Sequence, residues 1–243
     1  MRIPRIFQNI PLEINAKILL DMDATRHLGT VLRLSNDAKI ILFNGDGYEY
    51  PSIIHFSKRK VLEATIQDRV AKNVESPLFI HLGQVISKGP HMELTIQKSV
   101  ELGVTVITPL YSTRGDVHLK SEREERKLMH WQKIIIHACE QCGRTHIPKL
   151  EHPIPILEWV KNRQENTKLV LDHRATHTLK TIACTKDIAL LIGPEGGLSP
   201  EEISYITHNA FINIQLGPRV LRTETASIVA LSALQYLAGD LGS

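Results

Sequence analysis

The segment from Leu190 to Ile203 has the residue types of a ligand-binding loop. An apolar run enters the stretch Gly193–Gly197, which reads Gly-Pro-Glu-Gly-Gly, and a helix start at Ser199 follows. Glycines let a ligand approach the backbone, and the free N–H groups of a helix start can hold an anion. The stretch has neither the Gly-Lys-Ser/Thr of a phosphate loop nor the GxGxxG spacing, which disfavours nucleoside triphosphates and nicotinamide cofactors. A tight strand-to-helix connection without a ligand is the equally weighted alternative.

A second candidate site lies where the last helix begins, after a Gly-Pro turn at 217–218. Arg219, Arg222 and Glu224 crowd this helix start. A positive side chain there opposes the helix dipole, so a purely structural start would favour acidic residues. The arrangement therefore favours a functional site over a solvated surface.

Two other segments have simpler explanations. Lys88, Lys98 and their neighbours between 87 and 104 share one helix and its approach, which fits an amphipathic helix with a solvated face. Cys139 and Cys142 form a CxxC pair, but a zinc site needs further ligands at suitable spacing, and a redox pair usually begins a helix rather than ending one. We expect half-buried cysteines and no metal site.

A basic set near the start of the chain could contact phosphate groups. The set is Arg2, Arg5, Arg26, His27 and Arg33. The 243-residue chain has a formal net charge of +3, which permits a polyanionic partner without establishing one. Ordinary solvated charge is the alternative, and composition does not decide between them.

The cysteine count and the hydropathy pattern indicate in which cellular compartment the protein is found. The three cysteines are an odd number, which disfavours a secreted disulfide scaffold, and the first residues lack the apolar core of a signal peptide. No apolar run reaches the length of about 18 residues that a membrane helix needs. We expect a soluble cytoplasmic protein with no membrane partner.

The elements that would position these groups fall into two parts. Short strands at 38–43 and 61–66, with an Asn-Gly-Asp-Gly turn between them, predict a small β-barrel, and the polar residues 71–77 indicate a linker. From about residue 74 onward, strands alternate with helices, which predicts a parallel α/β sheet. The expected strands there are 78–86, 104–110, 168–171, 188–192 and 213–216, and the expected helices lie around 92–100, over 121–142, after 199 and over 225–238.

Together these segments resemble the ribosomal RNA small subunit methyltransferase E family, in the SPOUT class of trefoil-knot methyltransferases. The resemblance covers essentially the whole chain. Its motifs are MRIPRIF at the start, HLGTVLR at 27–33, HLGQVISKG at 81–89, ELTIQKSVELGV at 93–104, ACEQCGR at 138–144, LLIGPEGGLSPEEI at 190–203 and LGPRVLRTETA at 216–226. The last two are highly specific in this order.

The resemblance implies a fold and an activity. It implies a PUA-like RNA-binding β-barrel over 1–72 and a SPOUT α/β domain over 73–243 whose C-terminal trefoil knot is made by the loops around 193–197 and 216–222. It also implies a homodimer and S-adenosylmethionine as the methyl donor. The substrate would be N3 of a uridine in 16S ribosomal RNA within the small ribosomal subunit.

The resemblance also implies roles for individual residues. The expected cofactor-binding residues are Leu171, His173, Ile192, Gly193, Pro194, Glu195, Gly196, Gly197, Leu216, Gly217, Arg219, Val220, Leu221, Thr223, Thr225 and Ala226. The expected RNA-binding residues are Arg2, Arg5, Arg26, His27, Arg33, Lys88, Lys98, Arg114 and Arg144.

Uridine N3 is a poor nucleophile until it loses its proton. We therefore expect catalytic residues that handle this proton and the resulting charge. Glu224 is expected to receive or orient that proton, and Arg222 to stabilise charge on the uracil oxygens. A non-catalytic RNA-binding or ribosome-assembly protein with the same fold is the alternative. A small-molecule methyltransferase is a third possibility, but it leaves the β-barrel unexplained.

Overall fold

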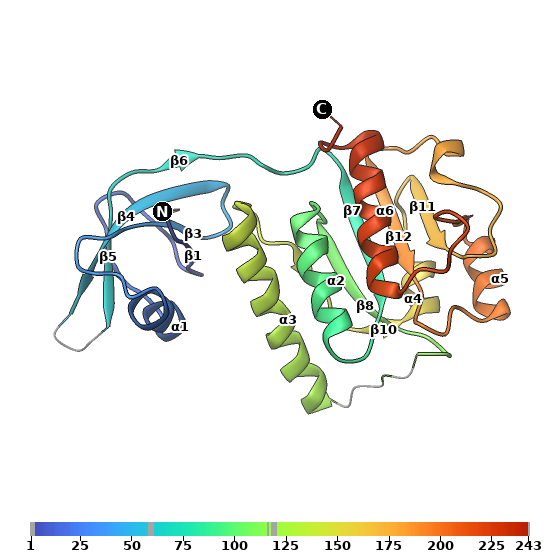
Figure 1. Ribbon diagram of the computed structural model, residues 1–243, viewed down its shortest axis with the longest axis horizontal. Helices are drawn as coiled ribbons and strands as arrows, with labels where there is room; N and C mark the ends of the chain where they lie inside the picture. Colours follow the sequence, from blue (N-terminus) through green and yellow to red (C-terminus); the bar gives the residue numbers. More distant parts are fainter. Residues whose placement is uncertain (1–2, 58–60, 116, 118–120, 243) are drawn as a thin grey trace. The chain divides into compact units, whose positions relative to one another are not determined.

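The protein separates into two compact units in a computed structural model (Figure 1). The structure describes residues 3–57, 61–115, 117 and 121–242, without the side chain of Ser121. One unit comprises Met1–Glu75 together with Cys139–Ile147, and the other comprises Ser76–Ala138 together with Pro148–Ser243. The domain boundary expected after residue 72 stays a prediction, as does the knot.

The first unit is built on a six-stranded, mostly antiparallel sheet with strand order β1-β3-β4-β5-β2, in which β6 also pairs with β4. Only β1 and β3 run parallel among the described pairs of this sheet. The elements are β1 (Arg5–Phe7), β2 (Lys17–Leu19), α1 (Met22–Arg26), the π-helical turn η1 (His27–Val31), β3 (Lys39–Phe43), β4 (Tyr48–Phe56), β5 (Leu62–Ile66) and β6 (Val70–Ala71).

The predicted turn between β3 and β4 is present, and it shows why this hairpin forms. Gly45 and Gly47 have φ angles of 97° and 88°, which residues with a side chain rarely adopt. Asp46 accepts a hydrogen bond of 3.0 Å from the backbone N–H of Tyr48 and one of 2.6 Å from the hydroxyl of Tyr50. Burial and the nearby Asp46 carboxylate raise the pKa of Tyr50 to about 12, so this hydroxyl stays a donor.

The second unit is a parallel α/β sheet with strand order β10-β8-β7-β12-β11-β13, in which β9 also pairs with β8. The alternation of strands and helices predicted this arrangement. The elements are β7 (Phe79–Val85), α2 (Pro90–Glu101), β8 (Val106–Tyr111), α3 (Ser121–Cys142), β9 (Lys149–Leu150), β10 (Ile154–Pro155), α4 (Ile156–Lys161), β11 (Thr167–Leu171), the 3-10 turn η2 (Leu179–Thr181), β12 (Asp187–Ile192), α5 (Pro200–His208), β13 (Ile212–Ile214) and α6 (Thr223–Ala238).

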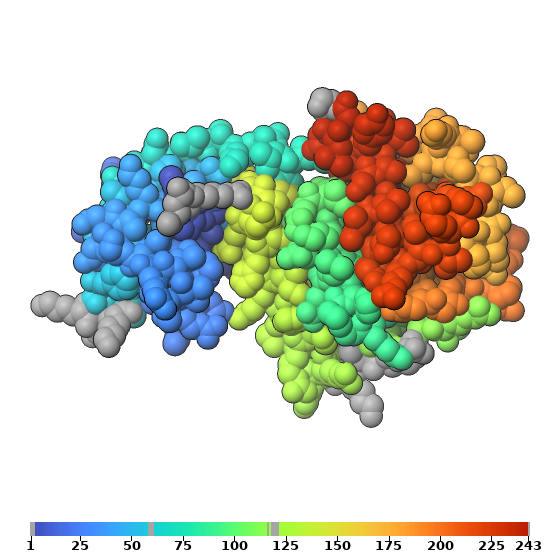
Figure 2. Space-filling view, viewed as in Figure 1, coloured from blue at the N-terminus to red at the C-terminus, as the bar shows by residue number. Residues whose placement is uncertain are grey.

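Helices cover both faces of the second sheet. Successive side chains of β7 point to opposite faces, so neighbouring residues of this strand contact different helices. A Cβ built on Gly83 would lie 2.8 Å from the ring of Trp159, so this glycine admits α4 against one face. The neighbouring Gln84 hydrogen-bonds to residues of α6 on the other face. On that face α6 packs beside α2 (Figure 2).

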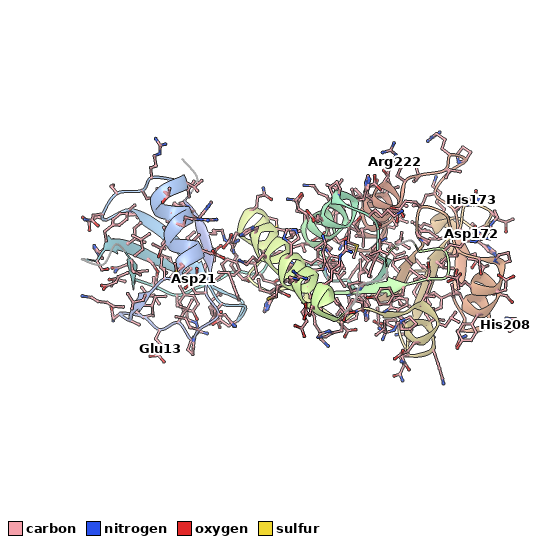
Figure 3. The ribbon with its side chains drawn as sticks, turned by 90° about the horizontal axis from the view of Figure 1, so that it is seen from below. Glu13, Asp21, Asp172, His173, His208 and Arg222 are labelled. Carbon is pink, nitrogen blue, oxygen red and sulfur yellow. The ribbon has the colours of Figure 1, made fainter. Side chains whose placement is uncertain are left out.

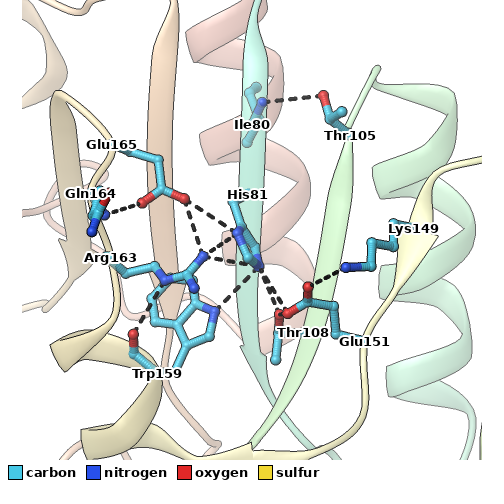
Figure 4. A network of polar contacts seen from close by, with 10 residues as sticks. All are labelled: Ile80, His81, Thr105, Thr108, Lys149, Glu151, Trp159, Arg163, Gln164 and Glu165. Carbon is cyan, nitrogen blue, oxygen red and sulfur yellow. Dashed lines mark hydrogen bonds and ion pairs between the residues drawn. The ribbon is translucent and has the colours of Figure 1, made fainter.

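A polar network lies under α4, around the buried His81 of β7 (Figure 4). Its Nδ1 atom lies 3.3 Å from Oε1 of Glu165, and its Nε2 atom lies 2.7 Å from the hydroxyl oxygen of Thr108. Thr108 in turn donates a hydrogen bond of 3.0 Å to Glu151. The guanidinium of Arg163 contacts both His81 and Glu165. The side chains of His81, Thr108, Arg163 and Glu165 therefore all have polar partners, which offsets the cost of their burial.

Glu165 makes this network sensitive to acid. Burial by itself would raise its pKa, but the hydrogen bond with His81 and the charge of Arg163 lower the pKa to about 2. Because the folded-state pKa lies below the unfolded value of about 4.3, the carboxylate stabilises the fold above that value and loses its effect as the pH falls towards 2.

We therefore predict that the free energy of unfolding falls more steeply between about pH 4.3 and 2 in the wild type than in Glu165→Gln. Urea unfolding at a series of pH values measures this. Glu158→Gln, which changes an exposed carboxylate of α4, should keep the wild-type slope. Equal slopes for wild type and Glu165→Gln would contradict the prediction.

Candidate functional site

Three parallel strands end at the same edge of the second sheet and open onto one cavity. The strands are β11, β12 and β13, and the cavity has a volume of about 370 Å³. Parallel α/β sheets bind ligands beyond the carboxyl ends of their strands, so this is the expected position of a site. The cavity walls include apolar side chains and backbone from the loops that follow each strand.

The glycine-rich loop after β12 forms one wall. The N–H of Gly197 donates a hydrogen bond of 2.9 Å to the carbonyl of Pro194, and Gly197 has a φ angle of 69°. A Cβ at Gly193 would approach the side chain of Leu198 to 3.0 Å. The predicted helix start follows: Ser199 and Glu202 form a reciprocal capping box at the beginning of α5. The loop is thus held in a defined shape by its own turn and by the cap.

The loop between β13 and α6 forms the facing wall. Gly217 has a φ angle of 75°, and a Cβ built on it or on Gly197 would meet no described atom within 4 Å. Arg219 and Val220 are exposed along this loop. Helix α6 begins at Thr223, two residues earlier than predicted, with Arg222 as its N-cap residue. Positive φ angles in both loops explain the glycines, and the open space beside them is available to a ligand.

A buried chain of hydrogen bonds joins the two loops. The hydroxyl of Thr223 donates to the carbonyl of Gly193 at 2.9 Å and lies 3.1 Å from the Nε2 donor of Gln84. Ser227 donates to the Oε1 atom of Gln84 at 2.6 Å. Sequence reasoning assigned no role to Gln84 or Ser227. The available signal was a glutamine inside the otherwise apolar end of β7.

Charged groups gather where β11 ends. Asp172 is buried, and its carboxylate accepts a hydrogen bond of 2.9 Å from Nε of Arg174. His173 is exposed beside them, and Figure 3 shows Asp172, His173 and Arg222 at the same end of this unit. Arg114 also lines the cavity. The rim therefore carries several cationic side chains, which suits an anionic ligand.

Most of the predicted cofactor-binding residues line this cavity, so the structure brings them together. They are Leu171, His173, Ile192, Gly193, Pro194, Glu195, Gly196, Gly197, Leu216, Gly217, Arg219, Val220, Leu221, Thr223 and Ala226. Arg222 also lines it, whereas Thr225 and Glu224 are not among the described lining residues. The binding roles of all these residues stay predictions.

Glu224 occupies a different position from the one its expected role suggests. Its side chain is buried, and Oε1 lies 3.0 Å from Nδ1 of His91 at the start of α2. Helices α2 and α6 are packed together here. The sequence showed no link between these two residues, because they are 133 positions apart.

Two of the predicted RNA-binding residues are buried and paired within the first unit, and their RNA-binding role stays a prediction. Arg5 is 6% exposed; its Nε atom lies 2.8 Å from Oε1 of Glu49, and its guanidinium donates to the carbonyl of Cys139. Arg144 is 5% exposed, and its Nε atom lies 3.0 Å from Oε2 of Glu75. Both side chains hold residues 139–147 within the first unit, where carboxylates and helix-end carbonyls satisfy their donors.

The other predicted RNA-binding residues lie in varied positions. Arg26, His27 and Arg33 are exposed around α1 and η1, and Lys88 is exposed before α2. Lys98 is paired with Glu101 on α2 at 2.7 Å. Arg2 lies outside the described residues.

Two further structural findings bear on partners. Within the described parts of the chain, no helix combines the length and apolar character needed to cross a membrane. No group of three or more His, Cys, Asp or Glu residues is arranged to hold a metal ion in those same parts.

The fold is that of an RNA methyltransferase with a PUA domain. A family model described as RNA methyltransferase domain matches residues 74–235, and one described as RNA methyltransferase PUA domain matches residues 20–66. The expected PUA-like domain followed by a SPOUT-class α/β domain is confirmed.

The chain belongs to the ribosomal RNA small subunit methyltransferase E family. It is 46% identical to the member from Buchnera aphidicola of Schizaphis graminum, with 99% of this chain and 98% of the relative covered. It is 29% identical to the Bacillus subtilis member, with 88% of each covered.

Solved structures agree over the full length. A methyltransferase from Legionella pneumophila, solved with the cofactor SAM, has a TM-score of 0.96 and 44% identity, with 99% of this chain and 100% of that chain covered. A ribosomal RNA small subunit methyltransferase E from Neisseria gonorrhoeae, bound to S-adenosyl methionine, has a TM-score of 0.92 and 37% identity, with 99% and 100% covered.

The buried and the exposed basic residues can be tested in parallel. Arg144→Ala should lower the free energy of unfolding by about 3 kcal/mol, because it leaves the Glu75 carboxylate without its guanidinium partner. Arg26→Ala should leave the free energy of unfolding within about 0.5 kcal/mol of wild type. It should also reduce the slope of the logarithm of the RNA-binding constant against the logarithm of salt concentration by about one. Urea unfolding and RNA titration at several salt concentrations measure both. A stable Arg144→Ala protein with weakened RNA binding would favour the RNA-binding role of Arg144.

Proposed function

We propose that this chain transfers a methyl group from S-adenosylmethionine to N3 of a uridine in 16S ribosomal RNA. Membership of the methyltransferase E family supports an enzyme of small-subunit ribosomal RNA. The observation that carries the proposal is the cavity at the ends of β11, β12 and β13, which combines two glycine-bearing loops, apolar walls and a cationic rim. A non-catalytic protein of this fold would have no need for such a cavity.

The residues of the cavity fit S-adenosylmethionine in chemical terms. Apolar side chains such as Leu171, Ile192 and Leu216 offer surfaces for an adenine ring. Positive φ angles at Gly197 and Gly217 leave open the space that side chains would fill, so backbone groups are accessible to the polar parts of the ligand. When bound, the sulfonium supplies an activated methyl group.

The protein's own task is to place the uracil and to manage its charge and proton. Uridine N3 becomes nucleophilic as it loses its proton, and negative charge then spreads onto the two uracil oxygens. Arg222 lines the cavity as the exposed N-cap residue of α6, where its guanidinium can stabilise that charge. Closing the pair of reactants into one cavity also converts an encounter in solution into a positioned reaction.

Glu224 is proposed to act on the proton together with His91. The carboxylate is buried 3.0 Å from Nδ1 of His91, whose side chain is 40% exposed. A carboxylate at this distance fixes the orientation of the imidazole ring through the contact at Nδ1. The pair can therefore receive a proton at the solvent-exposed imidazole, with Glu224 holding the ring in place.

The finer statements about partners form part of the same proposal. We infer that the chain acts as a cytoplasmic homodimer and that the 16S ribosomal RNA is methylated within the small ribosomal subunit. The exposed basic residues of α1 and η1, with Arg114 at the rim of the cavity, are the proposed contacts with RNA phosphates.

Arg222→Ala should reduce kcat by about a hundredfold or more, because a donor to the developing charge is lost. The Kd for S-adenosylmethionine, measured by calorimetry, should change less than about threefold. Arg123→Ala, an exposed arginine of α3, is the matched control and should leave both quantities unchanged. Methyl transfer near the wild-type rate in Arg222→Ala would show that this arginine has no part in the chemistry.

Mass spectrometry of ribosomal RNA tests the reaction in the cell. Deletion of the encoding gene should remove an N3-methyluridine from 16S ribosomal RNA, and complementation with the wild-type chain should restore it. Unchanged modification in the deletion strain would overturn the proposed function.

A further inference from the structure

We propose that Gln84 is a positioning residue that sets the shape of the cofactor pocket through Thr223. Gln84 is fully buried on β7 and is not among the described residues that line the cavity. Its partner Thr223 does line the cavity, as does Gly193, to which Thr223 is bonded. This inference rests on the proposed function, because it concerns how the same pocket holds S-adenosylmethionine.

The amide of Gln84 is held in one orientation. Its Nε2 group donates to the carbonyl of Val85 at 3.0 Å and to the hydroxyl of Thr223 at 3.1 Å. Its Oε1 atom accepts the hydroxyl of Ser227 at 2.6 Å. Exchange of the amide oxygen and nitrogen would bring Oε1 against the carbonyl of Val85, so these neighbours fix which end faces Thr223.

The orientation of Gln84 fixes the direction of the next hydrogen bond. A threonine hydroxyl has one hydrogen to donate. Because the N–H of Gln84 points at the hydroxyl oxygen of Thr223, this oxygen must accept there, and its own hydrogen goes to the carbonyl of Gly193 at 2.9 Å. The chain of donors therefore runs from Ser227 through Gln84 and Thr223 to Gly193.

This chain joins parts of the pocket that are far apart in sequence. Gly193 lies in the loop after β12, and Thr223, 30 residues later, begins α6 after the second glycine-bearing loop. Both loops contain a glycine with a positive φ angle, and the bond from Thr223 to Gly193 ties one loop to the other. Gln84 belongs to β7, which pairs with β12 over six residues, so it supplies a rigid reference for both loops.

Two buried threonines allow a matched comparison. Thr95 on α2 is fully buried, and its hydroxyl has no hydrogen-bond partner among the described residues. Thr95→Val and Thr223→Val make the same chemical change at buried sites of the same unit, but only the second removes the link to Gly193. Thr223→Ser keeps the hydroxyl and serves as the conservative variant. Gln84→Met keeps length and burial while removing the donor.

Calorimetry with S-adenosylmethionine alone tests the proposal without any RNA. Gln84→Met and Thr223→Val should each raise Kd about tenfold, which corresponds to about 1.4 kcal/mol, the size of one buried hydrogen bond. Thr223→Ser and Thr95→Val should stay within about twofold of wild type. Because Gln84 acts through Thr223, the double variant Gln84→Met with Thr223→Val should bind no more weakly than either single variant.

Two further readouts separate positioning from general destabilisation. The KM for S-adenosylmethionine should rise with Kd in Gln84→Met, while kcat at saturating cofactor changes less than about threefold. Amide hydrogen exchange of residues 193–198 without cofactor should be faster in Gln84→Met and unchanged in Thr95→Val. If Gln84→Met does not fold, Ser227→Ala tests the same chain, because it removes the hydroxyl that donates to Oε1 of Gln84, and it should raise Kd severalfold.

The outcomes distinguish this inference from the proposed function. Wild-type affinity in Gln84→Met, or an additive loss of about a hundredfold in the double variant, would overturn the positioning role alone. Failure of the wild-type protein to bind S-adenosylmethionine would overturn the proposed function instead.

Discussion

The candidate site depends on the parallel alignment of β11, β12 and β13, because only strands that run the same way deliver their following loops to one edge. That alignment places two glycine-bearing loops on facing walls of one cavity. The bond from the Thr223 hydroxyl to the Gly193 carbonyl closes the arrangement. The sheet thus brings the loops together, and a single buried hydroxyl keeps them together.

The two faces of the second sheet carry different kinds of polar interaction. Under α4, His81 and Glu165 form a network whose charges compensate one another. Under α6, Gln84, Thr223 and Ser227 form a neutral network next to the cavity. Neutral hydrogen bonds do not titrate at physiological pH, so the bonds among Gln84, Thr223 and Ser227 keep their donors and acceptors as the pH changes.

Much of the fold could be predicted from the sequence because periodicity and turn chemistry are local. The Asn-Gly-Asp-Gly turn, the capping box of Ser199 and Glu202, and the strand alternation all act within a few residues. Long-range partners were not predictable in the same way. The sequence suggested that Arg5 and Arg144 are surface charges, but both are buried and pair with carboxylates 44 and 69 residues away. Likewise, the position of Glu224 beside His91 depends on how α2 and α6 pack, which no single segment encodes.

The first unit is discontinuous, since it includes Cys139–Ile147 in addition to the first 75 residues. Glu49 and Glu75 are synthesised early, whereas Arg144, which neutralises Glu75, leaves the ribosome only after about half of the second unit has been made. All strands of the first sheet are therefore synthesised early, but the ion pair between Arg144 and Glu75 cannot form until Arg144 has emerged. A protein built in this way couples completion of its first unit to the synthesis of its second.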